Sequence, residues 1–213
     1  MVTVATGADR VVYSGGTKDA PIDFAGEGIY MVGARWEASP VGLRLLDPQS
    51  GTVRVIATAG DWTVIAAGAA WGINAELVGL GSNPDRIDRL DLTSGAVTTW
   101  YEAPADRWVM PIGQDFDGSP LIGVFTASTV AGPQVEDVYR LEGPAQVRYL
   151  FTGAATTQFI TPGNFTTDSH GLWFATLNGL MLYNDRVGLR LVAEDRGLPA
   201  GVTGISAAVG VCS

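Results

Sequence analysis

Short runs of apolar and β-branched residues alternate with glycine-containing turns along almost the whole chain. Glycine accounts for 28 of the 213 residues, roughly twice its ordinary share of about 7%. Hardly any stretch long enough for a helix keeps an apolar face at helical spacing without a Gly, Pro or β-branched interruption. The pattern therefore predicts an all-β protein with little or no helix.

A unit of strand, tight turn and strand recurs four times. Residues 45–55 match residues 89–99, and their turn glycines, Gly51 and Gly95, are 44 residues apart. Versions with shorter turns follow at residues 139–150 and 181–192. An apolar strand opened by a small residue precedes each hairpin, and we expect these strands at residues 28–32, 70–73, 120–124 and 171–175.

A fourth strand is expected before each of these units. The candidates are residues 10–14, 63–67, 109–113 and 158–162. Four strands in a repeat of about 40 to 50 residues are typical of propeller blades. A β-sandwich accommodates the same strands but does not require a repeated Leu-Asp-x-x-Ser-Gly turn. We therefore predict one β-propeller domain over residues 1–213, with four recognisable four-stranded blades and partial blades at the two ends.

The two ends of the chain raise the question of closure. Residues 2–5 and 202–211 are strand-like and belong to no complete unit. An open arc of blades exposes apolar sheet faces at both ends, which favours aggregation. The chain is therefore expected either to be a piece of a longer propeller or to close by pairing its ends in one shared blade.

One blade carries a family resemblance. Residues 167–183 contain Asp168, the run Gly171-Leu172-Trp173-Phe174 and the pair Gly179-Leu180, and they resemble the repeat of the two-component regulator propeller family. Gly197-Leu198-Pro199 is similar to the link between blades in that family. The resemblance implies a sensing module that acts in an extracellular or periplasmic location, although the chain shows no signal peptide.

A weaker resemblance is to propellers of the virginiamycin B lyase type. Those propellers share an Asp-x-x-Gly run and a following Asp-x-x-Ser/Thr-Gly turn, which occurs here at Asp47 and Asp91. The lyase resemblance implies a histidine general base on the ligand face. The sole histidine, His170, is expected in a turn on the opposite face, which counts against lyase activity.

Charge and cysteine content exclude several classes of function. Lys and Arg total 13 against 22 Asp and Glu, which gives a net charge of -9, so nucleic acid is not an expected partner. Cys212 is the sole cysteine and excludes a disulfide framework or a zinc finger within the chain. No stretch resembles a membrane span, so no membrane insertion is expected.

Motifs that resemble catalytic or metal sites have simpler interpretations. Neighbouring residues in one turn, such as Asp168, Ser169 and His170, seldom meet the geometry of a triad. Asp115 and Asp117 resemble part of a calcium loop but lack the remaining ligands, and an Asp-Gly turn needs no metal. Asp47 is expected to stabilise its hairpin turn through Ser50, and Asp91 through Ser94. No metal or cofactor is therefore expected.

Tryptophan and arginine gather in the loops that should form the ligand face, after the second and fourth strands. There the rings can stack on a sugar or peptide while charged groups fix its polar atoms. The alternative is that Trp62 and Trp108 wedge adjacent blades and contact no ligand. The predicted ligand-binding residues are Arg35, Trp36, Trp62, Arg107 and Trp108.

The expected function is that of a non-catalytic ligand-binding or sensing module that recognises a saccharide or a protein surface. A propeller enzyme of lyase or hydrolase type is the first alternative, and a structural scaffold is the second. The fold is better specified than the activity, because one propeller fold carries many functions.

Overall fold

The computed structural model describes residues 2–3, 8–9, 11, 13, 19–33, 42–74, 84–126, 134–152, 165–176 and 179–194. Within these ranges every regular element is a strand, as the sequence predicts. The part of the chain described contains no helix able to cross a membrane.

Sixteen of the strands form four four-stranded sheets. The first sheet contains β3 (Asp19–Ala25), β4 (Gly28–Gly33), β5 (Leu43–Leu46) and β6 (Val53–Ala57). The second contains β7 (Asp61–Ala66), β8 (Ala69–Ile73), β9 (Arg86–Asp91) and β10 (Val97–Glu102). The third contains β11 (Arg107–Gln114), β12 (Pro120–Thr126), β13 (Gln134–Gly143) and β14 (Gln146–Thr152). The fourth contains β15 (Phe165–Asp168), β16 (Gly171–Thr176), β17 (Gly179–Asn184) and β18 (Gly188–Glu194).

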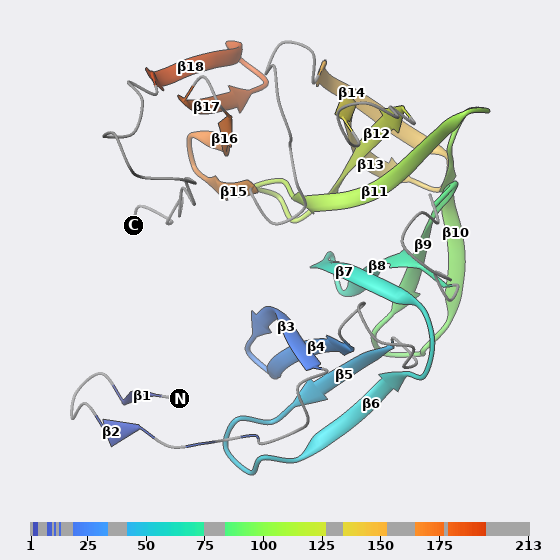
Figure 1. Ribbon diagram of the computed structural model, residues 1–213, viewed down its shortest axis with the longest axis vertical. Coiled ribbons are helices and arrows are strands. Elements are labelled where there is room, and N and C mark those ends of the chain that lie inside the picture. The colour runs from blue at the N-terminus through green and yellow to red at the C-terminus, as the bar shows by residue number, and fades with distance from the viewer. Residues whose placement is uncertain are drawn as a thin grey trace, which may run out of the picture.

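The sheets follow one another around an arc, with the first strand of each sheet on the inside (Figure 1). Within a sheet the strands pair antiparallel in chain order. Along the inside, β3 contacts β7, β7 contacts β11, and β11 contacts β15. This is the arrangement of propeller blades around an axis. The protein is therefore an all-β, propeller-like structure, and the predicted second strands and hairpins of all four blades are confirmed.

Two predicted innermost strands are wrong. The first sheet uses β3 (Asp19–Ala25) in this position and not residues 10–14. In the fourth sheet β15 (Phe165–Asp168) pairs with β16, whereas the predicted residues 158–162 lie outside the described ranges. Residues 10–14 are rich in Val and Tyr and β3 is not, so the local β propensity pointed to the wrong segment.

The hydrophobic core lies between consecutive sheets. One cluster joins the first and second sheets and includes Tyr30 and Trp62. A second joins the second and third sheets and includes Trp71 and Leu141. The third joins the third and fourth sheets, where the rings of Phe151 and Phe174 stack at 5.2 Å. Each blade thus buries an apolar face against its neighbour, which explains why the repeat must be stacked to be stable.

Glycine is required where some second strands begin. Gly28 has a φ of 151° and Gly171 a φ of 136°. A Cβ at Gly28 would lie 2.5 Å from the Leu46 carbonyl oxygen, and one at Gly171 would lie 2.2 Å from the Tyr183 carbonyl oxygen. The glycine of the repeat therefore lets the second strand approach the third.

The predicted hairpin turns at Asp47 and Asp91 are confirmed. The Ser50 hydroxyl donates to Asp47 Oδ2 at 2.6 Å, and the Ser94 amide and hydroxyl both donate to Asp91 Oδ1. Hydrogen bonds of this kind, chiefly from the Ser94 backbone, lower the pKa of Asp91 to about 2. The repeated Asp and Ser are therefore turn-forming residues.

A two-stranded sheet precedes the four blades. β1 (Val2–Thr3) pairs with β2 (Ala8–Asp9). Residues 202–211 lie outside the described ranges, so closure by the two ends stays a prediction.

Candidate functional site

A cavity of about 260 Å³ lies among the innermost strands. All four sheets contribute to its wall, which places it at the axis around which the blades are arranged. The lining residues are Ile22, Asp23, Thr63, Val64, Ile65, Ile112, Gly113, Gln114, Thr166 and Thr167. Residues of all four blades therefore form the cavity together.

Three of the four innermost strands carry a bulge at the same height. The register shifts between Pro21 and Asp23 in β3, between Trp62 and Val64 in β7, and between Pro111 and Gly113 in β11. Bulges commonly redirect side chains beside binding sites. The three extra residues, Ile22, Thr63 and Ile112, all line the cavity.

Sequence reasoning named none of the residues that line this cavity, although a signal was present. Pro21 and Pro111 each stand directly before an extra residue. A proline cannot donate a ladder hydrogen bond and is tolerated in a strand mainly at edges and bulges. Prolines at equivalent places in two repeat units therefore indicate a bulge in the innermost strand.

The polar groups of the cavity are hydroxyls, one amide and one carboxylate. Asp23 is the one charged residue among the lining residues described, and its Oδ1 accepts a hydrogen bond of 2.8 Å from the Phe24 amide. The Thr63 hydroxyl oxygen is buried and has no hydrogen-bond partner within the described structure. Hydroxyl, amide and carboxylate groups of this kind can exchange hydrogen bonds with a polar ligand.

The structure describes both Trp62 and Trp108 among the predicted ligand-binding residues. Arg35 and Trp36 lie outside the described residues. Trp62 is 0% exposed and Trp108 is 9% exposed. Trp62 Nε1 donates to the Ala59 carbonyl at 2.9 Å, and the Trp108 ring stacks on Phe125 at 4.1 Å. Trp62 and Trp108 belong to core clusters that join neighbouring blades, which is the packing that the alternative interpretation expects, and ligand binding by these two residues stays a prediction.

Arg107 is the first residue of β11 and lies half-buried at the predicted ligand face. The residue before it, Asp106, has a left-handed φ of 65°. The Arg107 amide donates to the Pro104 carbonyl at 3.1 Å. This tight turn determines where the innermost strand of the third blade starts.

Asp88 is a buried carboxylate that the sequence analysis did not single out. It accepts hydrogen bonds from the Asn74 amide at 2.8 Å, from Arg86 Nε at 3.2 Å and from the Thr99 hydroxyl at 2.7 Å. These contacts tie the end of β8 to β9 and β10. Asp88 therefore anchors the start of the loop after the second strand, on the predicted ligand face.

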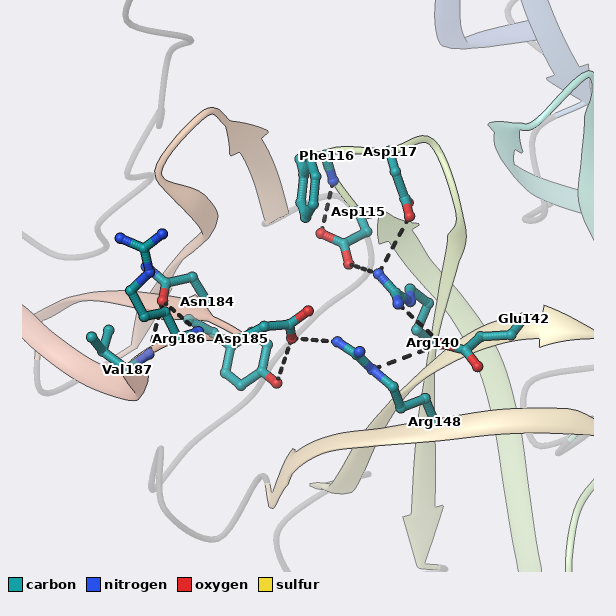
Figure 2. A network of polar contacts seen from close by, with 11 residues as sticks. Asp115, Phe116, Asp117, Arg140, Glu142, Arg148, Asn184, Asp185, Arg186 and Val187 are labelled. Carbon is teal, nitrogen blue, oxygen red and sulfur yellow. Dashed lines mark hydrogen bonds and ion pairs between the residues drawn. The ribbon is translucent and has the colours of Figure 1, made fainter.

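The opposite face carries a polar network that Figure 2 shows from close by. Arg140 Nη1 lies 3.1 Å from Asp115 Oδ2 and 3.3 Å from Asp117 Oδ2. Arg140 Nη2 lies 3.0 Å from Glu142 Oε1. Asp115 and Asp117, which resemble part of a calcium loop, thus both form an ion pair with the Arg140 guanidinium.

The same network joins the third blade to the fourth. Arg148 of β14 forms an ion pair with Asp185, in the turn after β17. This guanidinium is the main cause that lowers the pKa of Asp185 below its ordinary value. The Tyr183 hydroxyl also donates to Asp185 at 3.1 Å. These contacts span the junction of two blades and help to fix their relative position.

His170 lies in the turn between the first and second strands of its blade, where the sequence places it. Its Nδ1 atom lies 3.2 Å from Asp168 Oδ2 and its side chain is exposed. Asp168 Oδ1 accepts the Trp173 indole hydrogen bond at 2.8 Å. Asp168 is therefore a turn residue that holds Trp173, and His170 lies beside it on the surface.

No family model matches the chain, and no curated protein matches it. Among solved structures, the crystal structure of TolB from Acinetobacter baumannii is similar, with 17% sequence identity and a TM-score of 0.48. The match covers 79% of this chain and 41% of the TolB chain. The matched part of this chain therefore spans less than half of the TolB chain.

Proposed function

We propose that this protein is a non-catalytic binding module that takes a small, neutral, polar ligand at the central axis. The observation that carries the proposal is the cavity lined by all four innermost strands. Its volume of about 260 Å³ is close to the lower limit of about 300 Å³ for ordinary ligand pockets. It suits a single sugar ring or a group of similar size.

The charge of the protein favours a neutral saccharide over an anion. The net charge is -9, and the one charged residue among the described lining residues is Asp23. Hydroxyl groups of Thr63, Thr166 and Thr167 can exchange hydrogen bonds with sugar hydroxyls. Ile22 and Val64 offer apolar surface to the C–H groups of a ring. A protein surface remains the competing ligand class.

The resemblance to regulator propellers extends this proposal. It supports a sensing role outside the cytoplasm, in which the propeller is one part of a longer protein. Fractionation of cells that express the complete open reading frame tests this part: recovery in the cytoplasmic fraction would exclude it.

The binding proposal is tested with an array of neutral saccharides. The wild-type chain is compared with a variant that carries Thr166→Val and Thr167→Val, which removes two cavity hydroxyls at nearly constant volume. Leu191→Ala, at an exposed position of β18, is the control. We expect the double variant to lose the signal that wild type and control share. Equal signals for all three proteins contradict binding at the axis.

A further inference from the structure

Three tyrosines gather at the outer part of the junction between the second and third blades. Tyr139 of β13 and Tyr149 of β14 are directly opposite each other in the antiparallel ladder. Their ring centroids are 5.6 Å apart and their planes are inclined by 72°. Tyr101 of β10, in the neighbouring blade, packs with Tyr139 against the same core cluster. The three rings therefore come from two blades, and Tyr101 and Tyr139 share one core cluster because the blades stack.

A carboxylate accompanies the three rings. Asp137 precedes Tyr139 by two residues on β13, is half-buried, and pairs with Thr152 of β14. No arginine within the described ranges forms an ion pair with Asp137. This contrasts with Asp115, Asp117 and Asp185, each of which contacts an arginine.

The pKa values of the tyrosines support the proximity of this carboxylate. Burial, and then the charge of Asp137, raise the pKa of Tyr101 and the pKa of Tyr149. The same two causes, with smaller effects from Tyr101 and Tyr149, raise the pKa of Tyr139. All three rings therefore experience the negative charge of the same carboxylate.

Aromatic rings around a carboxylate form a site for an organic cation. The face of an aromatic ring is electrostatically negative, and tyrosine and tryptophan rings bind ammonium groups, above all quaternary ones. A metal ion is not suited, because within the described residues no group of three His, Cys, Asp or Glu side chains could hold one. A primary ammonium needs several hydrogen-bond acceptors, whereas the methyl groups of a methylated ammonium pack on rings.

We propose that Tyr101, Tyr139, Tyr149 and Asp137 form a second binding site, which accepts a methylated ammonium group. Tyr149 is 52% exposed, so a ligand can reach its ring from solvent. The site lies between the outer strands of two blades and uses no residue of the axial cavity. Binding at this second site can therefore be tested independently of the proposed saccharide binding.

The test is isothermal titration of the full chain with two probes of the same shape. Choline carries the quaternary ammonium, and 3,3-dimethylbutan-1-ol replaces its nitrogen by carbon and has no charge. We expect choline to bind and the neutral alcohol to bind at least about tenfold more weakly, because the cation–π and carboxylate interactions require the charge. Equal affinities, or no binding of choline at tens of millimolar to the folded protein, overturn the proposal.

Variants locate the binding. Tyr149→Ala is expected to weaken choline binding roughly tenfold, and Asp137→Asn to weaken it by a similar factor. Tyr149→Phe retains the ring and is expected to retain binding within about twofold. Leu191→Ala, at an exposed position of the equivalent outer strand β18, is the control. Unchanged affinity in Tyr149→Ala and Asp137→Asn, with folding verified by circular dichroism, overturns the assignment.

Two sources can supply such a group: a free small molecule or a methylated lysine of another protein. A short peptide with trimethyl-lysine, titrated beside choline and beside the same peptide with unmodified lysine, distinguishes them. Tighter binding of the trimethylated peptide than of choline indicates a protein source, and the reverse indicates a small molecule. Equal binding of the modified and unmodified peptides would contradict recognition of methylation.

Discussion

The Nη1 atom of Arg140 lies 3.1 Å from Oδ2 of Asp115, and this pair holds the β11–β12 turn against the third strand of the same blade. Both side chains are largely buried. Asp115 also accepts the Phe116 amide at 2.7 Å, so the carboxylate organises the turn from inside.

Replacing Arg140 by methionine is expected to destabilise the protein by about 3 kcal/mol, because it leaves the buried carboxylate of Asp115 without its cation. Urea denaturation measures the change as a lower midpoint at an unchanged slope. Arg190→Met, at an exposed position of β18, is the control and should change stability by less than about 0.5 kcal/mol. A similar small change for Arg140→Met would show that the pair contributes little.

Gly171→Ala is expected to destabilise the fourth blade by about 2 to 4 kcal/mol. The reason is that the new Cβ would lie 2.2 Å from the Tyr183 carbonyl oxygen, at a φ of 136°. Both the clash and the left-handed conformation are unfavourable. Gly26→Ala, where no atom lies within 4 Å, is the matched control. Thermal unfolding measures both variants, and equal melting temperatures would contradict this account of the glycine.

Stability should depend on pH through Asp91. Its pKa is lowered from 3.8 to about 2 in the folded state, so its turn contacts stabilise the protein above the ordinary pKa and are lost as pH falls from about 4 towards 2. The difference in urea midpoint between wild type and Asp91→Asn should therefore be largest near neutral pH and shrink below pH 4. A difference that stays constant from pH 7 to pH 2 would contradict the sign of this effect.

The strands that could be predicted from sequence are those with a repeated signature. Gly171 opens a second strand because no other residue fits there, and Asp91 marks a hairpin because its carboxylate binds the turn backbone. These requirements are local, so they are visible in the sequence.

The innermost strands β3 and β15 could not be predicted in this way. β3 (Asp19–Ala25) contains Pro21 and two aspartates, which have low β propensity. It is a strand because β4 pairs with it. The axial cavity and the site around Asp137 arise between blades, so no single segment of sequence shows them.

The loops of the predicted ligand face also yield a prediction. A double change of Trp36 and Arg107 to Ala should weaken binding by one to a few kcal/mol if these loops contribute to the axial site, since aromatic and Arg residues dominate many interfaces. Affinity for a saccharide identified on the array is measured by titration. Unchanged affinity in the folded variant places the site away from these loops.

The most direct test of binding at the axis is to fill the cavity. Thr167 lines it and is half-buried, so Thr167→Phe should occupy the space that the ligand needs. Titration of the saccharide identified on the array should show at least about a tenfold loss of affinity, whereas Leu191→Ala should bind like wild type. Full affinity in the folded Thr167→Phe variant would contradict ligand binding at the centre of the propeller.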